Sequence, residues 1–148
     1  MRCCPSGDAL LANAMLGALP PGEEVDLLRR VATRPPDAGG AGLHGDAHLQ
    51  NCLGSPRRPL WHDFETACRG PCEYDLAALV SRQRVMGDVA EATAALRAYG
   101  AHDADLLEAL LPLYIAWVTA SMLIALPRRP ALADAIEARL RWLRRRRR

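Results

Sequence analysis

Three polar side chains in the middle of the chain have the types and the spacing that phosphoryl transfer to a hydroxyl group requires. Asp46 and Asn51 are separated by four residues, and Asp63 lies twelve residues after Asn51. In such a reaction one carboxylate orients the acceptor hydroxyl and takes its proton, while an amide oxygen and a second carboxylate hold Mg²⁺ against the phosphates. A loop that turns back on itself would place Asp46 at the acceptor and Asn51 at the metal. A following hairpin would then bring Asp63 beside Asn51.

These side chains belong to three consecutive motifs. Residues 44–51 read His-Gly-Asp-Ala-His-Leu-Gln-Asn, residues 63–65 read Asp-Phe-Glu, and residues 70–77 read Gly-Pro-Cys-Glu-Tyr-Asp-Leu-Ala. The combination resembles the C-terminal lobe of the aminoglycoside phosphotransferase family, which is related in fold to the protein kinases. That family carries a His-Gly-Asp-x-His-x-x-Asn loop, then Asp-x-Glu or Asp-x-Asp, then a Gly-Pro-x-x-x-Asp-Leu-Ala segment that opens a helix. The match is dense over residues 43–79 and loose over the helices that follow.

The resemblance implies an activity and a role for the principal residues of the loop. It implies transfer of the γ-phosphate of ATP to a hydroxyl of a small molecule, which could be aminoglycoside-, choline- or sugar-like. Asp46 would be the catalytic base, and His44 would brace the loop. Asn51 and Asp63 would bind Mg²⁺ and, through it, the nucleotide.

The same resemblance gives supporting roles to three further residues. Glu65 would reach a second metal ion or its water shell, although a solvated loop carboxylate is an equally good interpretation. Asp75, at the start of a helix, would anchor the catalytic loop through backbone hydrogen bonds, a role compatible with that of a plain N-cap. His48 matches the family pattern as a loop residue but has no assigned chemistry.

Two other interpretations stay open at this point. All 19 basic residues are arginine, so the lysine that pairs the ATP phosphates in such enzymes is missing. The 43 residues before His44 read as helices, whereas the N-lobe that holds ATP needs a five-stranded sheet and roughly 60 residues. The chain could therefore be a truncated, catalytically inactive C-lobe fragment. Alternatively, His44, Asp46, His48 and His62 could form the site of a metallohydrolase.

The elements expected to position these residues form a mainly α, α+β fold: a helical body with a small β-hairpin. We expect one kinase-like C-lobe over residues 1–148, with the N-lobe absent. Its parts would be leading helices and a loop (1–40), the catalytic and metal-binding loops (41–72), and a helical subdomain with an arginine-rich tail (73–148). We predict helices at 8–19, 23–32, 73–86, 88–99, 103–126 and 130–145, strands at 41–44, 49–54 and 59–64, and a loop at 66–72.

The overall composition predicts in which compartment the protein lies and which partners it binds. The net charge is +2, and the five cysteines follow no secretory signal, so we expect reduced thiols in a cytoplasmic protein. The most apolar stretch, 106–126, contains Pro112 and Glu108, and we expect no membrane span. The arginine tail is expected to be a solvated helix end, which makes nucleic acid an improbable partner. The sequence does not predict an oligomeric state.

Overall fold

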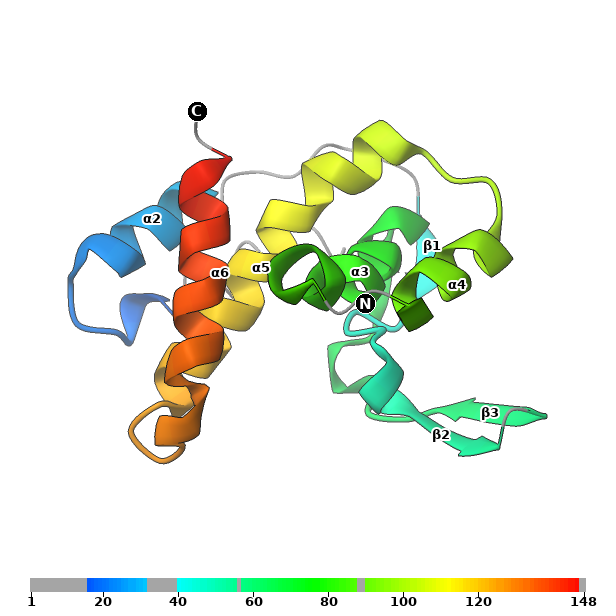
Figure 1. The fold of residues 1–148 in the computed structure, drawn as a ribbon, viewed down its shortest axis with the longest axis horizontal. Coiled ribbons are helices and arrows are strands. Elements are labelled where there is room, and N and C mark those ends of the chain that lie inside the picture. The colour runs from blue at the N-terminus through cyan, green and yellow to red at the C-terminus, as the bar shows by residue number, and fades with distance from the viewer. Residues whose placement is uncertain (1–15, 32–39, 56, 88–89, 147–148) are drawn as a thin grey trace.

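The computed structural model describes residues 16–31, 40–55, 57–87 and 90–146. Within them the fold is mainly α with small antiparallel β-elements, which confirms the predicted class (Figure 1). The helices are α2 (Glu23–Val31), α3 (Cys72–Met86), α4 (Ala90–Tyr99), α5 (Ala104–Ala125) and α6 (Ala133–Arg145). The predicted helix at 8–19 and the predicted start of a helix at 88 lie mostly outside the described residues.

The helix ends follow the local chemistry of the chain. Asp103 caps α5 by accepting a hydrogen bond from the backbone N–H of Leu106 at 3.0 Å. Gly87 ends α3 in the left-handed conformation that favours glycine. The predicted helix at 130–145 begins instead as a short 3₁₀ turn, Pro130–Leu132, before α6. Most helix bounds therefore agree with the prediction to within a few residues.

The strands differ more from the prediction. β1 (Ala41–Leu43) pairs antiparallel with β4 (Cys68–Gly70), and β2 (Cys52–Ser55) pairs antiparallel with β3 (Arg58–Trp61). The residues predicted as the start of the second strand form a 3₁₀ turn, Leu49–Asn51, which the bond from the Asn51 N–H to the His48 carbonyl closes. The end of the third predicted strand is likewise a 3₁₀ turn, Phe64–Thr66. The prediction of a plain loop at 66–72 is wrong, because β4 finds its partner in a strand far away in the sequence.

The helical body is built around α5. α3, α6 and α2 all pack against it, and α4 packs on α3. Leu110, Leu111 and Ile115 of α5 are fully buried. By length and composition α5 is apolar enough to cross a membrane, but half of its most apolar stretch is buried inside the fold, as in the core helix of a globular domain.

Helix α5 runs through Pro112 without ending there. A proline lacks the N–H that would bond to the carbonyl four residues earlier, here that of Glu108. Arg146, at the end of the structure, supplies the missing donor: its guanidinium donates to the Glu108 carbonyl at 3.2 Å and also pairs with the Glu108 carboxylate. The arginine tail is thus partly a structural brace.

The β2–β3 hairpin extends away from the helices (Figure 1). Leu53 and Leu60 on it are 56% and 66% exposed. Cys52 and Cys72 are free thiols, but Cys68 is disulfide-bonded, so the prediction of reduced thiols is wrong for Cys68. Spacing along a chain does not reveal which thiols meet in space, because the pairing is a tertiary contact.

Candidate functional site

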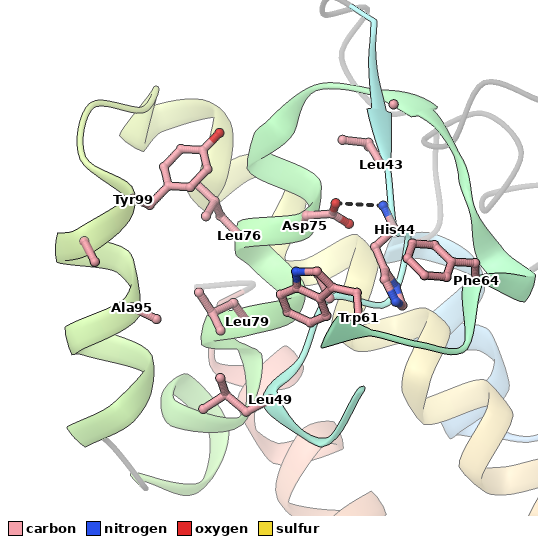
Figure 2. A pocket seen from close by; sticks show the side chains of 13 residues that line it. Leu43, His44, Leu49, Trp61, Phe64, Asp75, Leu76, Leu79, Ala95 and Tyr99 are labelled. Atoms are coloured by element: carbon pink, nitrogen blue, oxygen red, sulfur yellow. Dashed lines mark hydrogen bonds between the residues drawn. The ribbon is translucent and has the colours of Figure 1, made fainter. Parts of the chain in front are cut away.

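The loop after β1 turns sharply at Gly45. Its φ is +87°, and a Cβ at this position would lie 2.2 Å from the carbonyl oxygen of Thr66, so only glycine fits. Asp75, in the first turn of α3, accepts the backbone N–H group of His44 at 2.9 Å (Figure 2). It also accepts the backbone N–H group of Gly45 at 2.8 Å. Both carboxylate oxygens of Asp75 therefore hold the loop, and Pro71 rather than Asp75 occupies the N-cap of α3.

His44 links the loop to the segment that follows β3. Its Nε2 donates to the carbonyl of His62 at 2.8 Å, and its Nδ1 accepts the backbone N–H of Asp46 at 3.3 Å. Its ring lies 4.6 Å from the ring of Phe64 and 5.4 Å from that of Trp61, measured between centroids. Because both ring nitrogens are used in this way, His44 positions the loop and has neither nitrogen left for a metal ion.

The carboxylate of Asp46 is the point where three other side chains converge. The Tyr114 hydroxyl on α5 donates to one oxygen at 2.5 Å. The Asn51 amide donates to the other oxygen at 3.3 Å and to the Asp46 carbonyl at 3.0 Å. His48 Nε2 lies 3.4 Å from that same carboxylate oxygen. The structure thus brings Asp46, Asn51 and His48 together and adds Tyr114.

These contacts set the ionisation of the cluster. Partial burial alone would raise the pKa of Asp46, but the hydrogen bonds from His48 and Tyr114 outweigh it, so the pKa of Asp46 is lowered. The hydrogen bond with Asp46 raises the pKa of His48, although burial opposes it. Burial, followed by the charge of Asp46, raises the pKa of Tyr114 well above its ordinary value. Asp46 is therefore an ionised carboxylate at neutral pH.

Asn51 and Asp63 lie on adjoining segments. Cys52 pairs with Trp61 at the base of the hairpin, and the backbone N–H of His62 donates to the Asn51 carbonyl at 3.0 Å. Asp63 comes directly after His62, is exposed, and has a left-handed φ of 66°, which aspartate and asparagine tolerate better than most residues. Glu65 is exposed in the 3₁₀ turn that follows.

The donor set suits a hard cation held by few protein ligands. The side-chain N–H₂ group of Asn51 donates to the backbone carbonyl and to the carboxylate of Asp46. The side-chain oxygen of Asn51 is therefore the atom of this amide that could bind a metal ion. Mg²⁺ is usually bound by one or two carboxylates with substrate phosphates and water, so Asn51 and Asp63 are the side chains of this site that could serve as its ligands.

The alternative site of a metallohydrolase finds less support in the geometry. Among the described residues, no three His, Cys, Asp or Glu side chains come together as a metal-ligand group. His62 Nε2 lies 3.3 Å from the Gln50 carbonyl, and His44 is occupied within the loop. The four residues of that interpretation therefore do not converge on one point.

Tyr114 is the residue of this cluster that the sequence did not indicate. It lies 68 positions after Asp46, within a long apolar helix, where a tyrosine reads as ordinary core. A faint signal exists, since a fully buried tyrosine hydroxyl usually needs a partner.

Comparisons with protein-family models, with curated proteins and with solved structures find no match for this chain.

Proposed function

We propose that this chain carries the acceptor and metal-binding loops of an ATP-dependent small-molecule phosphotransferase, arranged as in the kinase-like C-lobe of the aminoglycoside phosphotransferase family. The observation that carries the proposal is the way the loop is held. Asp75 accepts two consecutive backbone amides, and Asn51 reaches back five residues to Asp46. These contacts join the first motif to the third, and the His44 ring, whose centroid lies 4.6 Å from that of Phe64, brings the first motif beside the second. Separate turn and surface residues would not require this arrangement.

Asp46 is the base in this proposal. Its carboxylate takes the proton of the acceptor hydroxyl while the acceptor oxygen bonds to the γ-phosphorus of ATP. The bond from that phosphorus to the β–γ bridging oxygen breaks, and ADP leaves. The lowered pKa of Asp46 keeps it ionised, and its hydrogen bonds to Tyr114 and Asn51 fix its orientation before the acceptor arrives.

Asn51 and Asp63 would hold Mg²⁺ through side-chain oxygens. When bound, Mg²⁺ neutralises charge on the phosphates and aligns them for attack. Glu65 lies two residues after Asp63 and is exposed, so it is available for a second ion or for a water molecule of the first.

A transfer assay tests this proposal. The purified chain would be incubated with Mg²⁺ and γ-labelled ATP, together in turn with an aminoglycoside, choline, an amino alcohol and a sugar. We expect label in at least one acceptor, and loss of that product in Asp46→Asn, which keeps the side-chain shape but removes the base. Asp105→Asn, an exposed carboxylate at the start of α5, serves as the matched control and should retain transfer.

The result also separates the active enzyme from the inactive alternative. Transfer by the Asp46→Asn variant at the rate of the unaltered chain would rule out Asp46 as the base. Binding of Mg²⁺-ATP without transfer to any acceptor identifies a nucleotide-binding but inactive protein, the second interpretation of the sequence. That second interpretation is favoured by the absence of any lysine in the chain.

A further inference from the structure

A pocket of about 770 Å³ lies beside the catalytic loop, between α3, α4 and the base of the hairpin (Figure 2). Its walls are largely apolar and include Leu76 and Leu79 of α3 and Ala95 of α4. Asp46, Asn51, His48 and Tyr114 do not line it, so it is distinct from the carboxylate cluster. Volumes of this size are typical of small-molecule sites.

Large apolar side chains are unusually exposed around this pocket. Leu49, Trp61, Phe64 and Tyr99 all line it, and they are 46%, 45%, 55% and 51% exposed. They come from three separate segments: the loop, the hairpin with its following turn, and the end of α4 (Figure 2). Exposed apolar residues scattered singly need no explanation, but four that converge on one cavity mark a binding site.

The Asp75 carboxylate and the His44 ring, which both line the pocket, are already engaged in hydrogen bonds. Both carboxylate oxygens of Asp75 accept backbone N–H groups of the loop, and both ring nitrogens of His44 are hydrogen-bonded. Among the described residues that line the pocket there is no lysine or arginine, so the walls offer an anion no cationic side chain of these types. An anion placed here would lose its hydration without gaining an oppositely charged partner, whereas an uncharged ring would lose little.

We infer that this pocket binds an uncharged aromatic or aliphatic small molecule, held by Trp61, Phe64 and Tyr99 against the apolar face of α3. Three aromatic rings supply the contact area, and the close-packed leucines supply the floor. The inference stands apart from the proposed phosphotransfer, because the residues that bind this ligand are not those assigned to base or metal.

A pair of probes with similar ring systems tests the inference. The full chain would be titrated with N-phenyl-1-naphthylamine, which is uncharged, and with 8-anilinonaphthalene-1-sulfonate, which carries a sulfonate. We expect saturable binding of the uncharged probe, and binding of the sulfonate at least about tenfold weaker because its charge has no partner in the pocket. The chain has three tryptophans, and the indole N–H signal of Trp61 should shift in NMR while those of Trp117 and Trp142 stay in place.

Replacing either of two native alanines on α4 by phenylalanine locates the site. Ala98→Phe fills the pocket and should weaken the uncharged probe at least about tenfold. Ala94→Phe adds the same ring to the same helix at an exposed position outside the pocket and should leave the affinity unchanged. Circular dichroism melting of both variants identifies one that fails to fold; should Ala98→Phe fail, the NMR shifts of the unaltered chain decide.

Several outcomes overturn the inference. Absence of saturable binding by the uncharged probe removes the site. Equal affinity of the folded Ala98→Phe variant and the unaltered chain, or movement of the Trp117 or Trp142 signal rather than that of Trp61, places the probe elsewhere. Equal or tighter binding of the sulfonate shows that the ligand class is wrong.

Discussion

Asp46 is the residue on which the contacts of the loop converge, and its neighbours decide how it ionises. Three hydrogen-bond partners reach its carboxylate from the same loop and from α5. The motif pattern identified Asp46, Asn51 and Asp75 as candidate site residues, because each has the side-chain type that the pattern requires at its position in the sequence. It could not predict Tyr114, whose position depends on how α5 packs in three dimensions.

The pair formed by Asp46 and His48 predicts a measurable titration. The pKa of His48 should lie above 6.5 in the folded chain and return towards 6.5 in Asp46→Asn. The imidazole signals in an NMR pH titration report both values. A His48 pKa that is the same in the two proteins would contradict the pairing.

The same pair predicts how stability depends on pH. A histidine whose pKa is raised by folding stabilises the protein fully below its unfolded pKa, and this contribution is lost as the pH rises through the folded value. Asp46→Asn should therefore reduce the free energy of unfolding more at about pH 6 than at about pH 9. Urea denaturation of both proteins at the two pH values measures the difference. In the His48→Gln background, the loss of unfolding free energy caused by Asp46→Asn should be nearly the same at the two pH values.

The bond between Tyr114 and Asp46 predicts a coupling energy. Tyr114→Phe removes only the hydroxyl and should lower the free energy of unfolding by about 1–3 kcal/mol, because the hydrogen bond is buried and its acceptor is charged. In the Asp46→Asn background the same change should cost less. Urea denaturation of the four proteins of this cycle gives the coupling, and additive effects would mean that the two residues do not interact.

At the scale of the elements, helix periodicity and cap residues predicted the helices well, whereas the strands were harder. β4 has only three residues and no pattern of its own, and it exists because β1 lies beside it. The 3₁₀ turns at Leu49–Asn51 and Phe64–Thr66 replaced predicted strand ends, and from them the Asn51 and Thr66 side chains donate hydrogen bonds back to Asp46 and His44. Local sequence carries little information about such long-range pairing.

The break that Pro112 makes in the bonding of α5 predicts a role for one arginine of the tail. Arg146→Ala should lower the free energy of unfolding by about 1 kcal/mol, since the Glu108 carbonyl loses its donor in a partly exposed setting. In the Pro112→Ala background the cost should shrink, because the restored N–H can bond to that carbonyl. The remaining cost reflects the Glu108 carboxylate and the Trp142 ring, which lies 4.6 Å from the Arg146 guanidinium.

A neighbouring arginine provides the control for this measurement. Arg145 is exposed and belongs to the same tail, so Arg145→Ala should change the free energy of unfolding by less than about 0.5 kcal/mol. An equal effect of the two substitutions would show that general tail charge, and not the freed carbonyl, accounts for the stabilisation. Thermal or urea unfolding of the four variants decides between them.

For the whole molecule, the sequence predicted a helical body with a small β-element, which the structure confirms, whereas the chemistry assigned to the loop stays a prediction. It did not predict the pocket between α3, α4 and the hairpin, because the aromatic residues in its walls come from distant segments. The pocket and the carboxylate cluster share the loop at residues 44–47, whose His44 and Ala47 face the pocket while Asp46 contacts α5. One loop thus lies between the apolar pocket and the carboxylate cluster.

We propose that this loop and the segment after β3 bind Mg²⁺ together with a nucleotide. Calorimetric titration with Mg²⁺-ATP tests it directly. We predict binding that requires Mg²⁺, that weakens by about tenfold or more in Asp63→Asn, and that changes by less than about threefold in Asp46→Asn. Asparagine tolerates the left-handed backbone at position 63, so that variant tests the charge and not the fold. Lack of binding at about millimolar nucleotide, or binding indifferent to both Mg²⁺ and Asp63→Asn, would contradict the account.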